Sequence, residues 1–264
     1  MKTEFETLAL DYPRENVLRV TLNRPERANA INTQAGRDLV ELFEEFLVDT
    51  HGLRCVVLTG AGDKAFSAGG DLKERKGMTD AQWLAQHAIF ERMVRAIAGC
   101  PVPLIGAVNG AAYGGGCELA GLCDFVYAAA HARFALTEVT LGIMPGAGGT
   151  QTLARAVGER RAKELILTGR PFTALEAREW GLVNAVYELP ELMDRVLDTA
   201  LRIADNAPIA VRQAKQSIHR GLQMSLADGL AFEIEAYNRM VPTQDRQEGI
   251  LAFNEKRKPR FRGV

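Results

Sequence analysis

The chain has 264 residues, of which 47% are hydrophobic and 25% are charged, values that are ordinary for a globular protein with a substantial core. Its formal net charge of −1 gives no global attraction to nucleic acid or to an anionic membrane surface. The four cysteines have neither disulfide nor zinc-ligand spacing, which favours free thiols in a reducing compartment. The first residues lack an apolar signal core and no apolar run reaches membrane-spanning length, so we expect a cytoplasmic protein without a membrane partner.

The first part of the chain alternates short apolar runs with helical patterns. Apolar runs predict strands at 17–22, 55–59, 102–108 and 124–128. Between the first two, residues 33–48 carry apolar side chains at helical spacing, with acids on the opposite face. Strands that alternate with helices predict an α/β fold with parallel strand pairing.

The pattern changes beyond about residue 146 and becomes mainly helical. We expect helices at 151–157, 161–168 and 174–180, one short strand at 182–186, and further helices at 190–205, 208–221, 225–240 and 243–256. The last of these carry spare apolar side chains, which predicts a partner subunit that buries Leu222, Met224, Leu226, Leu230, Phe232 and Ile234. We therefore divide the chain into a core that carries the site, residues 1–190, and a helical oligomerisation region packed on it, residues 191–264.

Two glutamates beside glycine-rich turns are the most informative feature. Glu118 follows the triple glycine Gly114–Gly116, and Glu138 precedes a second glycine-rich stretch that ends at 148–149. Glycine-rich turns expose backbone N–H groups, and a carboxylate carries protons readily. Donors for a developing negative charge together with two acid/base groups indicate chemistry next to a carbonyl.

Two strand-turn-helix junctions repeat one design. The strand at 55–59 leads through Gly69-Gly70 into a helix start, and the strand at 102–108 leads through the triple glycine into another. Free amides at a helix start stabilise an anionic oxygen. Two that converge form an oxyanion hole, worth about 2.7–4 kcal/mol per donor in a studied protease. Alternatively, each turn is only a turn, Glu118 favours helix initiation and Glu138 is a surface acid.

Several stretches closely resemble the crotonase (enoyl-CoA hydratase/isomerase) family. They are 66–73, 109–119 and 141–151, with shorter ones at 22–30, 180–184 and 248–257, so the resemblance covers nearly the whole chain in order. It implies a crotonase-like spiral of repeated ββα units with a helical C-terminal region. It also implies a homotrimer or a homohexamer built as a dimer of trimers.

The resemblance implies roles for individual residues. The oxyanion hole would be the backbone N–H groups of Gly70 and Gly115, and the hydratase acid/base pair would be Glu118 and Glu138. Many relatives have alanine where this chain has Gly70, but the N–H is retained. The residues implied to bind coenzyme A and the acyl group are Arg27, Ala28, Ala30, Ala68, Asp71, Leu72, Lys73, Tyr113 and Gly146, with Phe253 and Lys256 contributed by a neighbouring subunit.

The implied activity is the addition of water to a 2-enoyl-CoA thioester. Glu118 would act as base toward water and Glu138 as proton donor, although neighbouring carboxylates titrate as a coupled pair. The substrate itself contains coenzyme A, and neither a metal nor a redox cofactor is expected. The presence of both glutamates favours hydration over double-bond isomerisation, for which one is enough. An alternative of another class is a catalytically minor homologue that acts as a binding or scaffold protein.

The acyl group of the substrate is left open. Residues 75–93 are expected to cover the acyl chain, with Met78, Trp83, Ile89 and Phe90 as either pocket walls or ordinary helix core. Residues 72–75 and 241–249 resemble the methylglutaconyl-CoA hydratases, which makes that substrate the alternative. One member of that branch is associated with RNA through a lysine-rich early helix, but the acidic 33–48 helix here opposes RNA binding despite the basic tail at 256–262. The four histidines, His51, His87, His131 and His219, fall outside the site motifs and are expected to be surface or packing residues.

Overall fold

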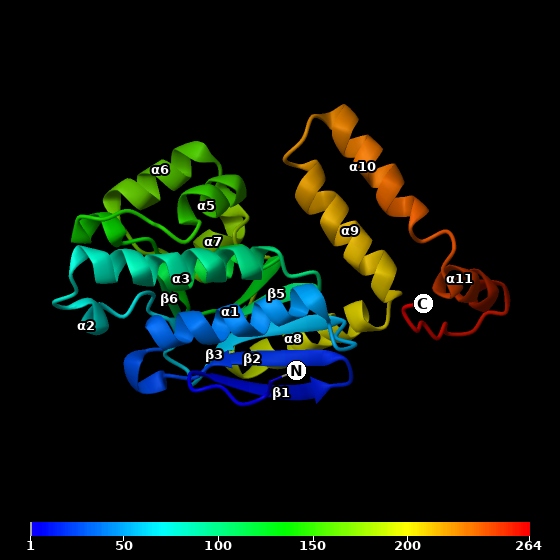
Figure 1. Cartoon of the computed structure of the whole chain (residues 1–264), viewed down its shortest axis with the longest axis horizontal. Helices are drawn as coiled ribbons and strands as arrows, with labels where there is room; N and C mark the ends of the chain where they lie inside the picture. The colour runs from blue at the N-terminus through cyan, green and yellow to red at the C-terminus, as the bar shows by residue number, and fades with distance from the viewer. Residues whose placement is uncertain (1) are drawn as a thin grey trace.

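The computed structural model describes residues 2–264 and is built around a six-stranded sheet (Figure 1). The strand order is β1–β2–β3–β5–β7–β10, in which β1 pairs antiparallel with β2 and every other pair is parallel. The strands are Leu8–Arg14 (β1), Val17–Leu22 (β2), Cys55–Gly60 (β3), Leu104–Val108 (β5), Phe125–Ala129 (β7) and Ala185–Tyr187 (β10). The predicted α/β class with parallel pairing is confirmed.

A second, four-stranded sheet carries the turns of interest. Its order is β4–β6–β8–β9, with β9 antiparallel to β8, and its strands are Ala65–Ser67 (β4), Ala111–Tyr113 (β6), Arg133–Ala135 (β8) and Phe172–Thr173 (β9). Three times, a strand of the large sheet is followed by a strand of the small one: β3 by β4, β5 by β6 and β7 by β8. Helices or a 3-10 turn follow each pair, namely Leu72–Arg75 (α2) with Asp80–Ala98 (α3), Gly115–Leu122 (α4), and Glu138–Leu141 (η2). This is the predicted spiral of repeated ββα units.

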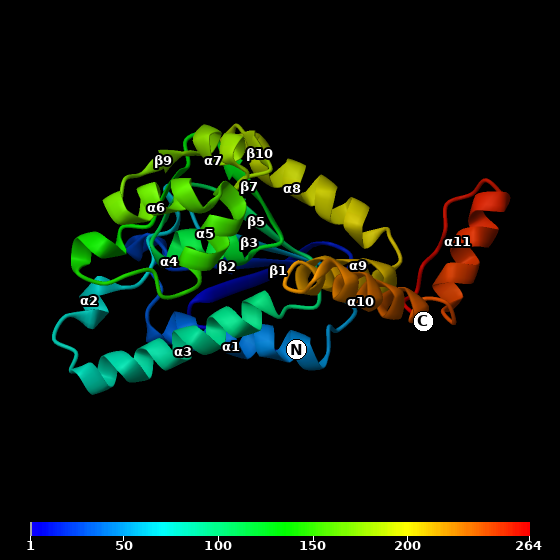
Figure 2. The same cartoon turned by 90° about the horizontal axis from the view of Figure 1, so that it is seen from above.

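Helices cover both faces of the large sheet (Figure 2). The helix Thr33–Val48 (α1) packs on α3 on one face, and Leu189–Ala204 (α8) lies against β3, β5 and β7 on the other. The predicted apolar stripe of α1 is buried, with Leu39, Leu42 and Phe43 fully inaccessible to water. The core therefore lies in two layers, one on each side of the sheet, and the sheet is held rigidly between them.

The remaining helices confirm that the chain is mainly helical beyond about residue 146 and that its C-terminal region is helical, as predicted. They are Gly149–Val157 (α5), Glu159–Thr168 (α6), Ala174–Trp180 (α7), Pro208–Gly221 (α9), Leu226–Asn238 (α10) and Gln244–Asn254 (α11), and a 3-10 turn, Pro25–Arg27 (η1), lies near the start of the chain. The α9–α10 hairpin projects away from the sheets in Figure 1, and it exposes most of the apolar side chains expected to meet a partner, such as Leu222 at 79% and Leu226 at 80%. The predicted division at residue 190 stays a prediction; α8 packs on the sheet, and the projecting part begins with α9.

One predicted strand is displaced, and five strands were not predicted. The strand expected at 182–186 begins at Ala185, because Leu182 and Val183 instead donate their N–H groups to the Ala177 carbonyl and complete the end of α7. The unpredicted strands are β1, β4, β6, β8 and β9. The last four have two or three residues each, too few for a period-2 pattern to register. Within residues 2–264, no helix is long and apolar enough to cross a bilayer.

The contact between α4 and β4 brings the two glycine turns together. A Cβ built on Gly116 would lie 2.1 Å from the Ser67 carbonyl oxygen, so only glycine permits this approach. We expect Gly116→Ala to push α4 off β4 and to lower the free energy of unfolding by about 1–3 kcal/mol. Urea denaturation at fixed protein concentration measures the change.

A matched control lies in another helix. A Cβ built on Gly249 in α11 would lie 3.5 Å from the Phe261 ring, an ordinary contact. Gly249→Ala is expected to leave stability unchanged or to raise it by up to about 1 kcal/mol through helix propensity. Equal destabilisation by both substitutions would show that the Gly116 contact is not special.

Candidate active site

The two predicted strand-turn-helix junctions lie side by side. The first junction is hydrogen-bonded to the backbone of Ile31. The Ile31 N–H donates to the Gly69 carbonyl at 2.7 Å, and the Ile31 carbonyl accepts from Asp71 N at 3.0 Å. A Cβ built on Gly69 would lie 2.8 Å from the Gly115 nitrogen, and one built on Gly115 would lie 3.6 Å from the Gly70 nitrogen. Gly70 and Gly115 line one cavity, and no acceptor among the described residues takes the N–H of either. This is the arrangement that an oxyanion hole needs.

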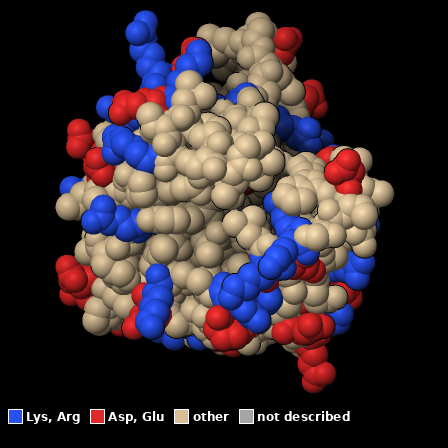
Figure 3. Space-filling view, turned by 90° about the vertical axis from the view of Figure 1, so that its left-hand side faces the viewer, with Lys and Arg blue, Asp and Glu red and all other residues tan. Residues whose placement is uncertain are grey.

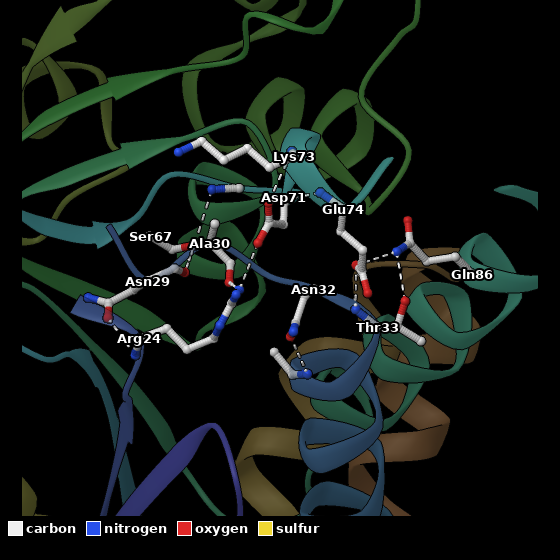
Figure 4. A network of polar contacts seen from close by, with 12 residues as sticks. Arg24, Asn29, Ala30, Asn32, Thr33, Ser67, Asp71, Lys73, Glu74 and Gln86 are labelled. Atoms are coloured by element: carbon white, nitrogen blue, oxygen red, sulfur yellow. Dashed lines mark hydrogen bonds and ion pairs between the residues drawn. The ribbon is translucent and has the colours of Figure 1, made fainter. Parts of the chain in front are cut away.

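A polar network fixes the first junction (Figure 4). Asp71 caps α2 by accepting from the N–H groups of Lys73 and Glu74, and its other oxygen pairs with Arg24 at 3.0 Å. Burial raises the pKa of this carboxyl, but the Arg24 guanidinium and the helix N–H groups outweigh that effect, so the pKa lies below its usual value. Arg24 also donates to the Ala30 carbonyl at 2.6 Å. The carboxylate of Asp71 thus holds the turn in place.

Glu118 is a buried carboxylate anchored on one side. It lies in the first turn of α4, and its Oε1 accepts from the N–H groups of Ala147 at 2.7 Å and Gly149 at 2.8 Å. Burial raises its pKa to about 7, against the two hydrogen bonds and with a smaller contribution from the charge of Glu138. The carboxyl therefore exchanges its proton near neutral pH, as a general base or acid must. No described group is bonded to Oε2, which remains available.

Glu138 lies at the start of η2 and lines the same cavity as Glu118. It is 9% exposed, and burial raises its pKa above the usual value. Its Oε2 is buried and has no hydrogen-bond partner among the described residues. An unsatisfied buried oxygen is costly, so it marks a place where a ligand or a proton is expected.

The cavity that these groups share has a volume of about 510 Å³, within the range of small-molecule sites. It lies between α2 and α3 on one side and residues 137–147 on the other. The surface at the end of the molecule that carries α2 is mostly uncharged at its centre, with both basic and acidic residues around it (Figure 3). The structure brings together seven of the predicted residues in this cavity: Gly70, Gly115, Glu118, Glu138, Ala68, Leu72 and Gly146.

The other predicted residues do not line the cavity. Arg27 and Lys73 are exposed, Ala30 is buried, and Ala28, Asp71 and Tyr113 flank the turns. Phe253 and Lys256, predicted to act across a subunit interface, lie at the end of α11 on the far side of the molecule (Figure 1). The roles of these residues in binding coenzyme A stay predictions.

Two of the four candidate acyl-pocket walls line the cavity, Trp83 and Phe90, while Met78 and Ile89 do not. The cavity is also lined by Arg75 and Met93, the ends of the segment predicted to cover the acyl chain. His87 lines it too, so the expectation that this histidine is only a surface or packing residue was wrong. Wall residues that were not named as candidates are Ile31, Thr137, Leu141, Ile143, Met144, Pro145 and Ala147. His87 shares a face of α3 with Trp83 and Phe90, because positions four and seven residues apart lie on one side of a helix. The spacing of residues 83, 87 and 90 in the sequence could therefore have indicated that His87 faces the same cavity as Trp83 and Phe90.

The family model for enoyl-CoA hydratase/isomerase matches residues 13–264. The chain belongs to the enoyl-CoA hydratase/isomerase family. YngF of Bacillus subtilis is 46% identical over 250 residues, which covers 95% of this chain and 96% of that protein. A short-chain-enoyl-CoA hydratase of Clostridium acetobutylicum is 44% identical, covering 90% of this chain and 91% of the relative.

The comparison with solved structures leads to the same family. The crystal structure of an enoyl-CoA hydratase from Bacillus anthracis superposes with a TM-score of 0.96 at 44% identity, over 98% of this chain and all of that one. The predicted family and its crotonase fold are confirmed. The family and the hydratase names of its members confirm the predicted class of enzyme, a hydro-lyase.

The raised pKa of Glu118 predicts a pH-dependent stability effect. Because its pKa rises from an ordinary 4.5 to about 7 on folding, the stability that this group contributes is fully present below about pH 4.5 and is lost as the pH rises through about 7. Glu118→Gln keeps an oxygen acceptor and removes the titration. We expect the variant to be more stable than wild type by up to about 3 kcal/mol near pH 8, with the difference vanishing near pH 4.5.

Urea denaturation across this pH range measures the effect. Glu179→Gln, on the exposed side of α7, controls for the loss of one negative charge. A stability difference for Glu118→Gln that is the same at both ends of the range would contradict the burial argument.

Proposed function

We propose that this enzyme adds water across the 2,3 double bond of a 2-enoyl-CoA thioester. The observation that carries the proposal is the pairing of Glu118 and Glu138, two buried carboxyls with raised pKa values, in one cavity with two unpaired backbone N–H groups. Hydration needs a base for water, an acid for the α-carbon and donors for the enolate oxygen. All of these fit into a single site here.

In the proposed mechanism, the N–H groups of Gly70 and Gly115 bind the thioester carbonyl oxygen. They draw electron density from the conjugated system and make the β-carbon electrophilic. As water attacks, negative charge collects on the carbonyl oxygen, where the N–H groups and the dipole of α4 stabilise it. Because folding has already oriented these donors, they need no reorganisation during the reaction.

The two carboxyls divide the proton transfers. Glu118 is anchored through Oε1 by two N–H groups, so its Oε2 is free to remove a proton from water as the oxygen bonds to the β-carbon. Glu138 has a buried, unpartnered oxygen, and burial favours its neutral form, which donates a proton to the α-carbon as the enolate collapses. The product is a 3-hydroxyacyl thioester, and the mechanism uses no metal or redox cofactor.

The binding of coenzyme A and the assembly are further parts of the proposal. Ala68 and Leu72 line the cavity beside the oxyanion hole, where the pantetheine would enter, and Arg27, Ala28 and Ala30 lie on the adjoining segment. The projecting α9–α10 hairpin exposes apolar side chains that association into a trimer or a dimer of trimers would bury. In such an assembly, Phe253 and Lys256 of one subunit would complete the binding site of its neighbour.

The decisive test is hydration of crotonyl-CoA, followed by the loss of the conjugated enoyl-thioester absorbance. We expect wild type to hydrate it and Glu118→Gln and Glu138→Gln each to lower kcat by about 10²–10⁴-fold, since each removes one proton-transfer group. Glu179→Gln controls for the loss of charge. Full activity in either site variant would rule out the two-carboxylate mechanism; isomerisation of a 3-enoyl thioester without hydration would favour the isomerase alternative.

The pH profile separates the roles of the two carboxyls. If Glu118 is the base, kcat falls as the pH drops below about 7, because the carboxyl becomes protonated. The acidic limb of the wild-type profile should be missing from the residual activity of Glu118→Gln. A limb that survives this substitution would assign the base role to another group.

A further inference from the structure

His87, on α3, is a titratable wall residue that the proposed mechanism does not use. The other titratable side chains in the wall of the cavity are those of Glu118, Glu138 and Arg75. A guanidinium does not give up its proton in a protein, so Arg75 is no proton carrier. Histidine is the residue that most often accepts and returns protons in enzyme sites. Beyond the two carboxyls, His87 is therefore the wall residue suited to proton transfer.

A carboxylate holds one side of the imidazole ring. His87 Nδ1 lies 3.1 Å from Glu91 Oε1, one turn further along α3, and Glu91 Oε2 lies 3.5 Å from Arg95 Nη1. Because a carboxylate only accepts hydrogen bonds, Nδ1 carries the hydrogen in this pair. In the neutral ring Nε2 is then an acceptor, and the Glu91 carboxylate stabilises the cation that forms when Nε2 takes up a proton.

The Nε2 side of the ring faces Gly146, in the segment that anchors Glu118. A Cβ built on Gly146 would lie 2.9 Å from Nε2, and no described group hydrogen-bonds to that nitrogen. The next residue, Ala147, donates its N–H to Glu118 Oε1 at 2.7 Å. His87 Nε2 and the carboxyl of Glu118 thus approach neighbouring residues of one segment, and both groups line the same cavity.

The carboxyls are shielded from bulk water, whereas His87 is partly open to it. Glu118 is 3% exposed and Glu138 is 9% exposed. The side chain of His87 is 37% exposed. The imidazole therefore borders both the cavity and the solvent, and it has room to turn between partners.

The proposed reaction leaves the protons of the carboxyl pair reversed. In each turnover Glu118 gains the proton that it removes from water, and Glu138 loses the proton that it gives to the α-carbon. The next hydration needs an ionised Glu118 and a neutral Glu138 again. One proton must therefore leave Glu118, and one must reach Glu138, between turnovers.

We infer that His87 resets the carboxyl pair after each turnover by carrying the proton from Glu118 back to Glu138 on Nε2. The inference rests on the proposed function. Water that refills the cavity after product release links the ring to each carboxyl. Nε2 of the neutral ring accepts the proton from Glu118, and the imidazolium, held by Glu91, then releases it to Glu138. One proton moves between the carboxyls, and the net charge of the site does not change.

The first test separates the first turnover from those that follow. With enzyme in excess over crotonyl-CoA, each site reacts once and needs no reset, so rapid-quench measurements should give the same rate for wild type and His87→Gln. With substrate in excess, kcat of His87→Gln should fall about tenfold or more, because the proton carrier is missing. The variant should form one product per site rapidly and the rest slowly. His219→Gln, in the exposed last turn of α9, should match wild type in both regimes.

The second test supplies the missing ring from solution. His87→Ala leaves a space beside Gly146, and added imidazole should restore much of its kcat without changing its single-turnover rate. Imidazole should have no effect on wild type. Glu91→Gln keeps an acceptor for Nδ1 but removes the charge that stabilises the imidazolium, so its kcat should fall by less than that of His87→Gln.

Three results would overturn the inference. An unchanged kcat in His87→Gln would show that the carboxyls reset through water alone. An equal loss in the single-turnover and steady-state rates would place His87 in the chemical step or in the packing of the wall. A loss in His87→Ala that imidazole does not reverse would exclude a proton carrier at this position. Absence of hydration by wild type in both regimes would instead overturn the proposed function, and this inference with it. Gel filtration and circular dichroism establish that the variants fold and assemble as wild type does.

Discussion

The structure depends on the contact between two glycine-rich turns, one after β4 and one after β6. Gly116 lies directly against the Ser67 carbonyl, and Gly69 lies against the nitrogen of Gly115. Both turns extend strands of the small sheet, in which β4 and β6 pair in parallel, so their carboxyl ends meet at one edge. Gly70 and Gly115 thereby line one cavity, and neither N–H has an acceptor among the described residues. The packing of the two sheets and their helices keeps these two turns in contact.

The cavity brings together groups that are unfavourable to bury. Glu118 and Glu138 are carboxyls with raised pKa values, and Arg75 is a half-buried cation whose Nε donates to Gln86 and which forms no ion pair with a described carboxylate. Burial disfavours the charged form of each, so each lowers the stability of the folded state at neutral pH. The large sheet, covered on both faces, supplies the stability that offsets these costs.

Much of the fold was predictable from local pattern. Strands β2, β3, β5 and β7 of the large sheet and helices α1 and α5 to α11 carry apolar runs or helical spacing, and their predicted ends lie within two residues of the observed ones. Strand β1 and the long helix α3 were not predicted with bounds. The small sheet was not predicted, because strands such as β4 and β6 have three residues each and form only through pairing with distant segments. Likewise, the first residues of the strand expected at 182–186 do not join the sheet, because Leu182 and Val183 hydrogen-bond to the Ala177 carbonyl at the end of α7. The hydrophobic pattern of the sequence does not reveal which of these two partners the backbone takes.

For the site, the sequence by itself determined the chemical groups: the glycines that expose backbone N–H, the two glutamates and the family they indicate. Local composition suffices there, because glycines permit a close backbone approach such as that of Gly116 to Ser67, and a carboxyl side chain can carry a proton wherever it lies. Only the tertiary structure decided which groups share a cavity. It placed Gly70 beside Gly115, and it turned Glu74 toward Thr33 and Gln86, so that Arg75 lines the cavity without an ion pair. Burial, distance and the absence of a counterion are properties of the packed chain, and no run of neighbouring residues encodes them.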